Sequence, residues 1–160
     1  EHMWKIREEI SDAQTRERGS VRCDVSVAIS SMARFIAEAT DRVLAIAPLA
    51  RMVIYGHVGD GNVHFNPLRP ADETAEEFVK ACGAAITEAA DGLAVELNGS
   101  ISAEHGVGVA KRDELLECKP AVELDLMWSI KHALDPTGVM NPGKVLPMRK
   151  RQNLGVSMAP

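Results

Sequence analysis

Residues 52–66 constrain the fold of this 160-residue chain more than any other segment. Two short β-prone runs flank Gly59-Asp60-Gly61-Asn62, and an Asp-Gly pair between such runs is a strong hairpin signal. With a two-residue Asp-Gly loop, His57 faces His64 across the hairpin. Directly opposed residues on one face have Cβ atoms roughly 4.5–5.5 Å apart. The sequence therefore predicts two neighbouring imidazoles able to chelate one divalent ion, and a purely structural histidine pair is the alternative.

Glu104 offers a third ligand, in the run Ser102-Ala103-Glu104-His105-Gly106. Residues 100–104 have the pattern of a short strand that ends near this carboxylate. An anionic oxygen beside two imidazoles suits Zn, Fe, Co, Ni or Mn, and three protein ligands leave positions open for substrate. His105 is expected to point elsewhere, where a histidine can act as a general base. From these residues alone, a solvated loop is the stronger interpretation.

The rest of the chain alternates helical and strand patterns. Period-2 alternation predicts a half-buried strand over residues 21–27. Apolar periodicity and breaker residues predict helices over residues 4–18, 30–47, 74–96, 107–117 and 121–134. Helices combined with a hairpin indicate an α+β fold with helices packed on an antiparallel sheet.

Composition narrows the class of protein. The net charge of −5 argues against a nucleic-acid partner. Three scattered cysteines, Cys23, Cys82 and Cys118, predict free thiols in a reducing compartment, and hence a cytoplasmic location that could be peripheral to a membrane. No apolar run reaches the roughly 18 residues that a transmembrane helix needs. The first residue, Glu1, already lies in a helical pattern, so we expect a fragment of a longer protein.

Three segments together resemble a known family. They are GHVGDGNVH at 56–64, ISAEHGVG at 101–108 and LDPTGVMNPGK at 134–144. Their order and spacing are similar to the C-terminal substrate, or cap, domain of FAD-linked oxidases of the vanillyl-alcohol-oxidase type. Members include D-lactate dehydrogenases, the glycolate oxidase flavin subunit and D-2-hydroxyglutarate dehydrogenase. The resemblance implies part of a ferredoxin-like cap domain over residues 1–147 with a C-terminal helical segment, a tail at 148–160, and an FAD-binding domain outside this chain.

The resemblance also implies residue roles. His57, His64 and Glu104 would bind a divalent metal, often zinc, and His105 would take the hydroxyl proton while hydride passes to the flavin. Substrate contacts would come from Arg7, Ser11, Arg22 and Asn66, and Asn141 lies in the segment that runs toward the flavin. Two positions depart from the family pattern: Arg22 stands where a lysine is usual, and Ala28 where a proline is common.

The resulting expectation is a fragment of an FAD-dependent D-2-hydroxy-acid dehydrogenase, inactive alone. Metal, base and arginine would together supply charge neutralisation, proton abstraction and positioning of a 2-hydroxy acid such as D-lactate, glycolate or D-2-hydroxyglutarate. Expected partners are this small substrate and an electron-accepting protein or quinone, and a homodimer is an open alternative. Two other functions compete: a flavin-independent metal hydrolase, which would have no use for the Asn141 segment, and a non-catalytic α+β binding module.

Overall fold

The computed structural model describes residues 2–148, apart from the side chains of His2, Arg7, Glu8 and Ser11. The chain divides into two compact units, Glu1–Gly106 and Val107–Pro160. The fold of the described part is α+β, as the sequence predicts. In chain order its elements are α1 (His2–Glu17), β1 (Cys23–Ser26), η1 (Ile29–Ser31), α2 (Met32–Ile46), β2 (Arg51–His57), η2 (Val58–Asp60), β3 (Asn62–Leu68), α3 (Ala75–Glu96), α4 (Arg112–Cys118) and α5 (Ala121–Leu134).

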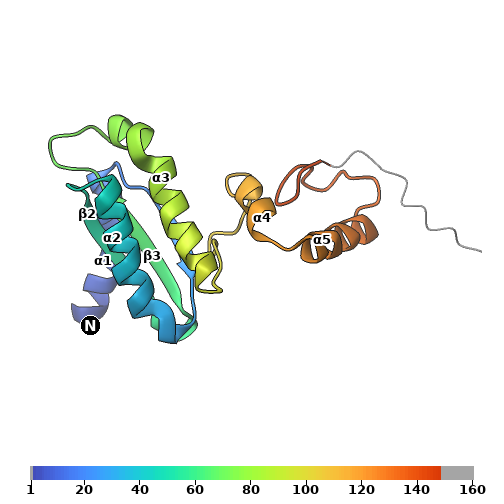
Figure 1. The fold of residues 1–160 in the computed structure, drawn as a ribbon, viewed down its shortest axis with the longest axis horizontal. Helices are drawn as coiled ribbons and strands as arrows, with labels where there is room; N and C mark the ends of the chain where they lie inside the picture. Colours follow the sequence, from blue (N-terminus) through green and yellow to red (C-terminus); the bar gives the residue numbers. More distant parts are fainter. Residues whose placement is uncertain (1, 149–160) are drawn as a thin grey trace, which may run out of the picture. The chain divides into compact units, whose positions relative to one another are not determined.

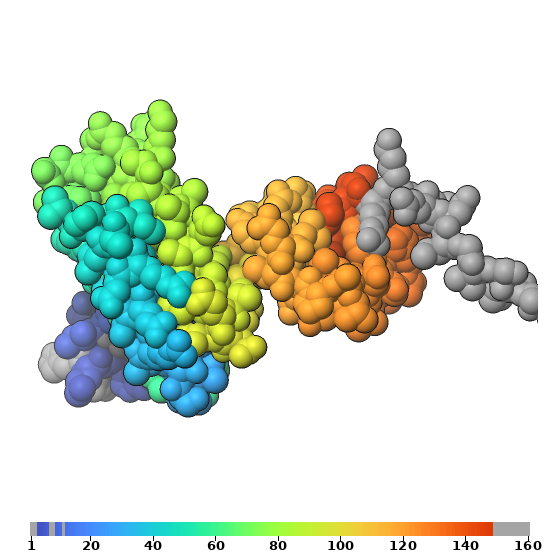
Figure 2. All heavy atoms as spheres, viewed as in Figure 1, coloured from blue at the N-terminus to red at the C-terminus, as the bar shows by residue number. Residues whose placement is uncertain are grey.

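The first unit is built on a three-stranded antiparallel sheet in the order β1-β3-β2. Because side chains alternate along a strand, one face of the sheet carries the apolar residues. Val25 of β1 and Phe65 of β3 are fully buried there, and the Phe65 ring meets Phe35 of α2 edge to face. Helices α2 and α3 lie side by side over this face (Figure 1), and Figure 2 shows their side chains meeting in one continuous surface.

Local sequence signals explain where α3 begins. Thr74 caps the helix: its side chain accepts a hydrogen bond from the backbone N–H of Glu77, and the Glu77 carboxylate accepts one from the backbone N–H of Thr74. This reciprocal pair is the capping box of a Thr-x-x-Glu sequence. Its position confirms the helix predicted from residue 74 to 96.

The hairpin exists, but its register differs from the predicted one. His57 pairs with Asn62, and His64 pairs with Tyr55 rather than with His57. The turn is longer than two residues because η2 forms one short helical turn, which Gly61 closes in the left-handed conformation at φ 77°. Each residue of the hairpin pairs two positions away from its predicted partner. Because this shift is even, the side chains keep the face that the alternation assigns to them.

Two further predictions need correction. Residues 100–104 do not form a strand; Ser100 makes one isolated bridge to Ser26, and the segment continues as a loop. The helix predicted over residues 107–117 begins only at Arg112. The backbone N–H groups of residues 103–105 find another partner, described below.

The second unit contains α4 and α5, and α5 has the predicted bounds. Asp135 ends α5, and its carboxylate accepts hydrogen bonds from Lys131 Nζ at 2.6 Å and from the backbone N–H groups of Val139 and Met140. The Lys131 ammonium holds the pKa of Asp135 below its usual value, against a smaller opposing effect of burial. The Asp-Pro-Thr-Gly stop is therefore a hydrogen-bonded cap.

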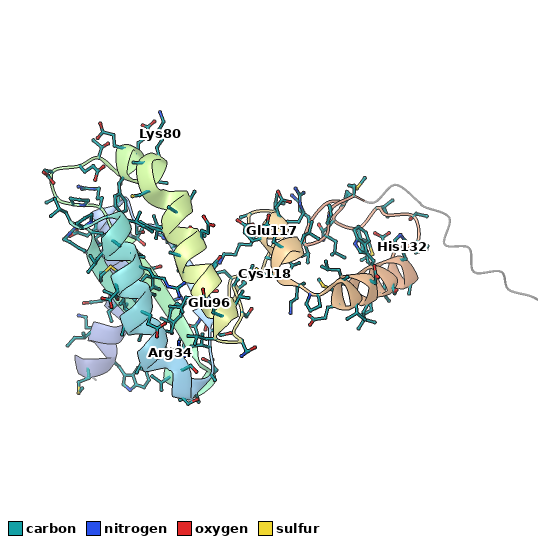
Figure 3. All side chains as sticks on the ribbon, in the orientation of Figure 1. Arg34, Lys80, Glu96, Glu117, Cys118 and His132 are labelled. Carbon is teal, nitrogen blue, oxygen red and sulfur yellow. The ribbon has the colours of Figure 1, made fainter. Side chains whose placement is uncertain are left out.

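The cysteines are free thiols, as predicted. Cys23 is buried in β1, Cys82 is half-buried in α3, and Cys118 is exposed on α4 (Figure 3). Within residues 2–148, no helix combines the length and apolar character required to cross a membrane. The predicted tail at 148–160 lies, apart from Met148, outside the described residues.

Candidate metal centre

The polar face of the sheet, opposite α2 and α3, brings two histidines and one glutamate together. Glu104 Oε1 lies 3.3 Å from His57 Nε2, and Glu104 Oε2 lies 3.5 Å from His64 Nε2. One ligand atom from each of the three residues lies within 4.8 Å of the others. Two ligands bound at about 2.0–2.1 Å to a tetrahedral zinc are roughly 3.4 Å apart. The donor set and its spacing therefore fit a divalent metal.

His57 and His64 are neighbours despite the altered register. They occupy diagonal positions on one face, and their ring centroids are 5.9 Å apart. A shift by two residues moves the histidines from directly opposed to diagonal places without moving either to the other face. The predicted pair is thus present with a different geometry.

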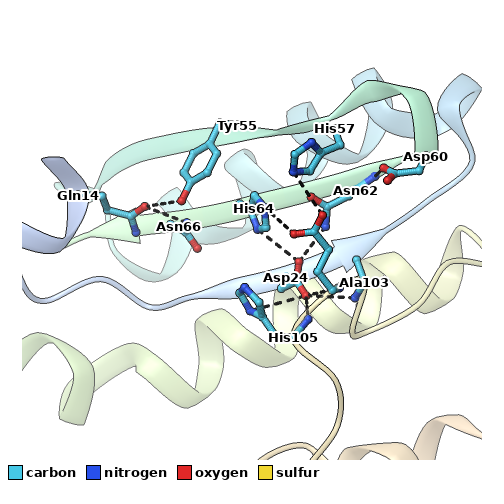
Figure 4. Close-up of polar contacts among 11 residues, drawn as sticks. Gln14, Asp24, Tyr55, His57, Asp60, Asn62, His64, Asn66, Ala103 and His105 are labelled. Carbon is cyan, nitrogen blue, oxygen red and sulfur yellow. Dashed lines mark hydrogen bonds and ion pairs between the residues drawn. The ribbon is translucent and has the colours of Figure 1, made fainter. Parts of the chain in front are cut away.

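The loop that carries Glu104 is held at this face by a further residue, Asp24 of β1. Asp24 Oδ2 accepts hydrogen bonds from three successive backbone N–H groups, those of Ala103 at 3.2 Å, Glu104 at 2.8 Å and His105 at 2.9 Å (Figure 4). Its other oxygen accepts a bond from Asn62 Nδ2 at 2.8 Å. These bonds hold the loop against the sheet, in place of the strand pairing that the sequence predicted.

The same contacts keep Asp24 ionised. Its side chain is only 3% exposed, and burial alone would raise the pKa of the carboxyl group. Hydrogen bonds from the backbone of His105 and Glu104, and from Asn62, together outweigh burial and leave the pKa of Asp24 below its usual value. A buried negative charge therefore lies beside the imidazole of His64, whose Nδ1 is 3.3 Å from Asp24 Oδ1.

A pocket of about 370 Å³ opens next to these groups within the first unit. His57, His64 and Glu104 line one part of it, and Arg22 lines another. Its full lining consists of Ile10, Gln14, Thr15, Arg22, Tyr55, Gly56, His57, His64, Asn66, Glu104 and His105. The pocket thus combines the metal-ligand set with a cation and several neutral hydrogen-bonding groups.

Two residues expected to contact substrate or to act as base lie at this pocket. The His105 side chain is 63% exposed and stacks on His64 with ring centroids 5.6 Å apart. Arg22 donates a long hydrogen bond, 3.5 Å, to Thr15 Oγ1 of α1. An exposed imidazole and a weakly tethered guanidinium are both able to reach a ligand.

Asn66 is buried at the other end of the pocket. Its Nδ2 donates to Gln14 Oε1 at 3.0 Å, and Tyr55 OH donates to the same oxygen at 3.2 Å. Gln14 Nε2 is buried without a hydrogen-bond partner. This network from α1 fixes the amide of Asn66 at the pocket wall (Figure 4).

Other predicted site residues lie outside this assembly of described side chains. The side chains of Arg7 and Ser11, on α1, are outside the described part of the structure. Asn141 belongs to the second unit, where its backbone is left-handed at φ 45°. The roles that the resemblance implies for these three residues remain predictions.

Sequence reasoning missed four residues of the site: Gln14, Asp24, Tyr55 and Asn62. For Asp24 a signal was present, because it is one of the polar members of the alternating pattern at 21–27 and must face away from the core. Gln14 gave no comparable signal. Its role depends on how α1 packs against the sheet.

Comparison with known proteins identifies the family. The sequence model of "FAD linked oxidases, C-terminal domain" matches residues 1–145. The chain belongs to this family. The resemblance inferred from the three sequence segments is confirmed.

The chain is also similar to curated D-2-hydroxyglutarate dehydrogenases. That of Xanthomonas citri pv. viticola is 41% identical over 143 residues, or 89% of this chain and 30% of that protein. That of Stutzerimonas stutzeri is 37% identical over 145 residues, or 91% of this chain and 31% of that protein. The mitochondrial enzyme of Rattus norvegicus is 36% identical over 148 residues, or 92% of this chain and 26% of that protein.

The chain spans about a quarter to a third of the length of these relatives. The rat relative is named as mitochondrial, so the cytoplasmic location expected for this chain stays a prediction.

Proposed function

We propose that this chain supplies the metal and substrate site of an FAD-dependent D-2-hydroxy-acid dehydrogenase. Of D-lactate, glycolate and D-2-hydroxyglutarate, we propose D-2-hydroxyglutarate as the substrate, because the curated relatives are named for it. The observation that carries the proposal is the convergence of His57, His64 and Glu104 beside a pocket that also presents Arg22 and His105.

The metal ligands are His57, His64 and Glu104, with zinc as the preferred ion. Two imidazole nitrogens and one carboxylate form a typical catalytic set that leaves a position open to substrate. A bound divalent ion would stabilise negative charge that develops on the 2-hydroxyl oxygen. The 44% exposure of the Glu104 side chain leaves the ligand set accessible from the pocket.

The protein's own groups then position the acid and move its proton. Arg22 contributes a cation that attracts a carboxylate, and Asn66 contributes an amide that Gln14 holds in place. His105 accepts the hydroxyl proton at one of its ring nitrogens, because it is the exposed imidazole beside the ligand set. Arg7 and Ser11 complete the substrate contacts, and Asn141 contributes to the flavin side.

The proposal is tested on the complete reading frame that contains this chain. We expect one equivalent of divalent metal and bound FAD in the purified protein, and reduction of an acceptor dye by D-2-hydroxyglutarate. Glu104→Gln removes the anionic ligand without changing its size, and should abolish both stoichiometric metal and turnover. Glu117→Gln, an exposed glutamate on α4, is the control for metal content.

Three results would separate the alternatives. Metal-dependent hydrolysis without flavin would favour a hydrolase. Absence of metal from the wild-type protein, with unchanged stability in His57→Ala, would favour a non-catalytic module. Turnover of D-lactate or glycolate in preference to D-2-hydroxyglutarate would retain the reaction class and change the substrate.

A further inference from the structure

Asp24 is the most heavily hydrogen-bonded side chain near the metal-ligand set. Its two oxygens receive three backbone N–H groups and one amide, and a fifth contact is with His64 Nδ1. A sixth, longer contact joins His105 Nδ1 to Asp24 Oδ2 at 3.6 Å. A carboxylate has about four lone-pair sites, so these contacts leave no acceptor site of Asp24 for an added ion. The carboxylate is 3% exposed, whereas that of Glu104 is 44% exposed.

This saturation distinguishes two overlapping groups that could hold an ion. Within the described residues, one group is His57, His64 and Glu104, and the other is Asp24, His64 and His105. A metal bound to Asp24 would have to displace partly buried hydrogen bonds from three backbone N–H groups, at a cost in free energy. A metal bound to Glu104 would displace only its contacts with two imidazole nitrogens. Asp24 therefore fits a supporting role better than a ligand role, whereas His64 belongs to both groups.

Asp24 controls the position of Glu104 through the backbone. The loop at 101–106 has no strand pairing of its own. Three successive N–H groups instead converge on Asp24 Oδ2, and the N–H of Ala103 also lies 3.2 Å from the backbone oxygen of Asp24. The Glu104 carboxylate is thereby directed to the strand that carries His64.

Asp24 also orients the imidazole of His64. Nδ1 of this ring lies 3.3 Å from Asp24 Oδ1, and Nε2 lies 3.5 Å from Glu104 Oε2. A carboxylate that accepts from one ring nitrogen holds the proton there and leaves the other nitrogen free for a metal. One side chain thus acts on two of the three ligands.

We propose that Asp24 is a positioning residue of the metal centre, which directs the Glu104 carboxylate and the Nε2 atom of His64 to one ion. This inference rests on the metal-binding function proposed above. It assigns no contact between Asp24 and substrate or metal.

Asp24→Asn tests the inference because it removes the charge and replaces one acceptor oxygen with a donor. Zinc affinity is measured on the purified protein by competition with a chelating dye. We expect a roughly 10- to 100-fold weaker Kd, the usual loss when an outer partner of a metal ligand is removed. Substituted Co²⁺ should show altered absorption bands in the variant, since the ligand geometry changes.

Asp135→Asn is the matched control. Asp135 is also buried and also accepts two backbone N–H groups, but it belongs to the second unit. It should leave the zinc Kd and the Co²⁺ bands unchanged. A folded Asp24→Asn protein with the wild-type Kd and Co²⁺ spectrum overturns the positioning role alone. A wild-type protein that fails to bind zinc overturns both the metal site and the inference, and His57→Ala would then match wild type.

A measurement on the wild-type protein covers the case in which Asp24→Asn does not fold. In the zinc-loaded protein labelled with ¹⁵N-histidine, the nitrogen chemical shifts report which atom of His64 carries the proton. We expect Nδ1–H, with Nε2 bound to the metal. Metal on Nδ1 and the proton on Nε2 would refute the proposed orientation.

Discussion

Replacing Phe65 with alanine tests how much the apolar face of the sheet contributes to the stability of the unit that carries the proposed metal ligands. Phe65 is fully buried on β3, directly after His64, and packs edge to face on Phe35 with ring centroids 5.8 Å apart. Truncating a buried phenylalanine removes its transfer free energy and leaves a cavity, at a typical cost of about 3–5 kcal/mol. A domain of this size has a total stability of about 5–15 kcal/mol. We expect Phe65→Ala to lose a large part of the free energy of unfolding, but not all of it.

The free energy of unfolding is measured by urea titration with far-ultraviolet circular dichroism, with and without zinc. Because zinc would bind the folded first unit, a hundredfold excess over Kd should restore about 2.7 kcal/mol to Phe65→Ala. The control is Val95→Ala, since Val95 is a partly exposed apolar residue of α3 and should change stability by about 0.5 kcal/mol or less. A loss below about 1 kcal/mol for Phe65→Ala would refute the assignment of Phe65 to the core.

Other substitutions test the capping, turn and charge arguments. Thr74→Ala removes the capping box of α3 and should lower the free energy of unfolding by about 1 kcal/mol. This loss would be measured as a decrease in Tm of about 4 °C or more. Gly61→Ala should destabilise the hairpin by at least about 1–2 kcal/mol in urea, because φ is 77° and a Cβ would lie 2.0 Å from the backbone oxygen of Val27; an unchanged midpoint would contradict the turn geometry. Asp135→Asn should lower the urea midpoint near neutral pH, because the Lys131 ammonium depresses the pKa of Asp135 in the folded state. A depressed pKa gives stability above the unfolded value of about 3.9 that is lost as pH falls through the folded value, so the difference between wild type and variant should shrink as the pH is lowered below the unfolded value.

The sequence alone determined that a hairpin forms and which of its side chains share a face. Because side chains alternate with a period of two, His57, His64 and Asn66 remain together under any even shift of register. The helix at 121–134 was equally well determined, since its start after Pro120 and its end at Asp135 are local signals. Motifs spread along the chain also identified the family before any geometry was known.

Tertiary structure decided the rest. The actual register, with His57 opposite Asn62, depends on a 3₁₀ turn that fits against the backbone of Val27, a contact that no local pattern encodes. Glu104 joins the histidines because Asp24, some 80 positions earlier in the chain, accepts the backbone bonds of its loop. Local patterns report periodicity and turn chemistry, whereas a hydrogen bond between distant segments exists only after the chain has folded. The paired histidines were thus visible in the sequence, and the carboxylate that orients one of them became visible only in the fold.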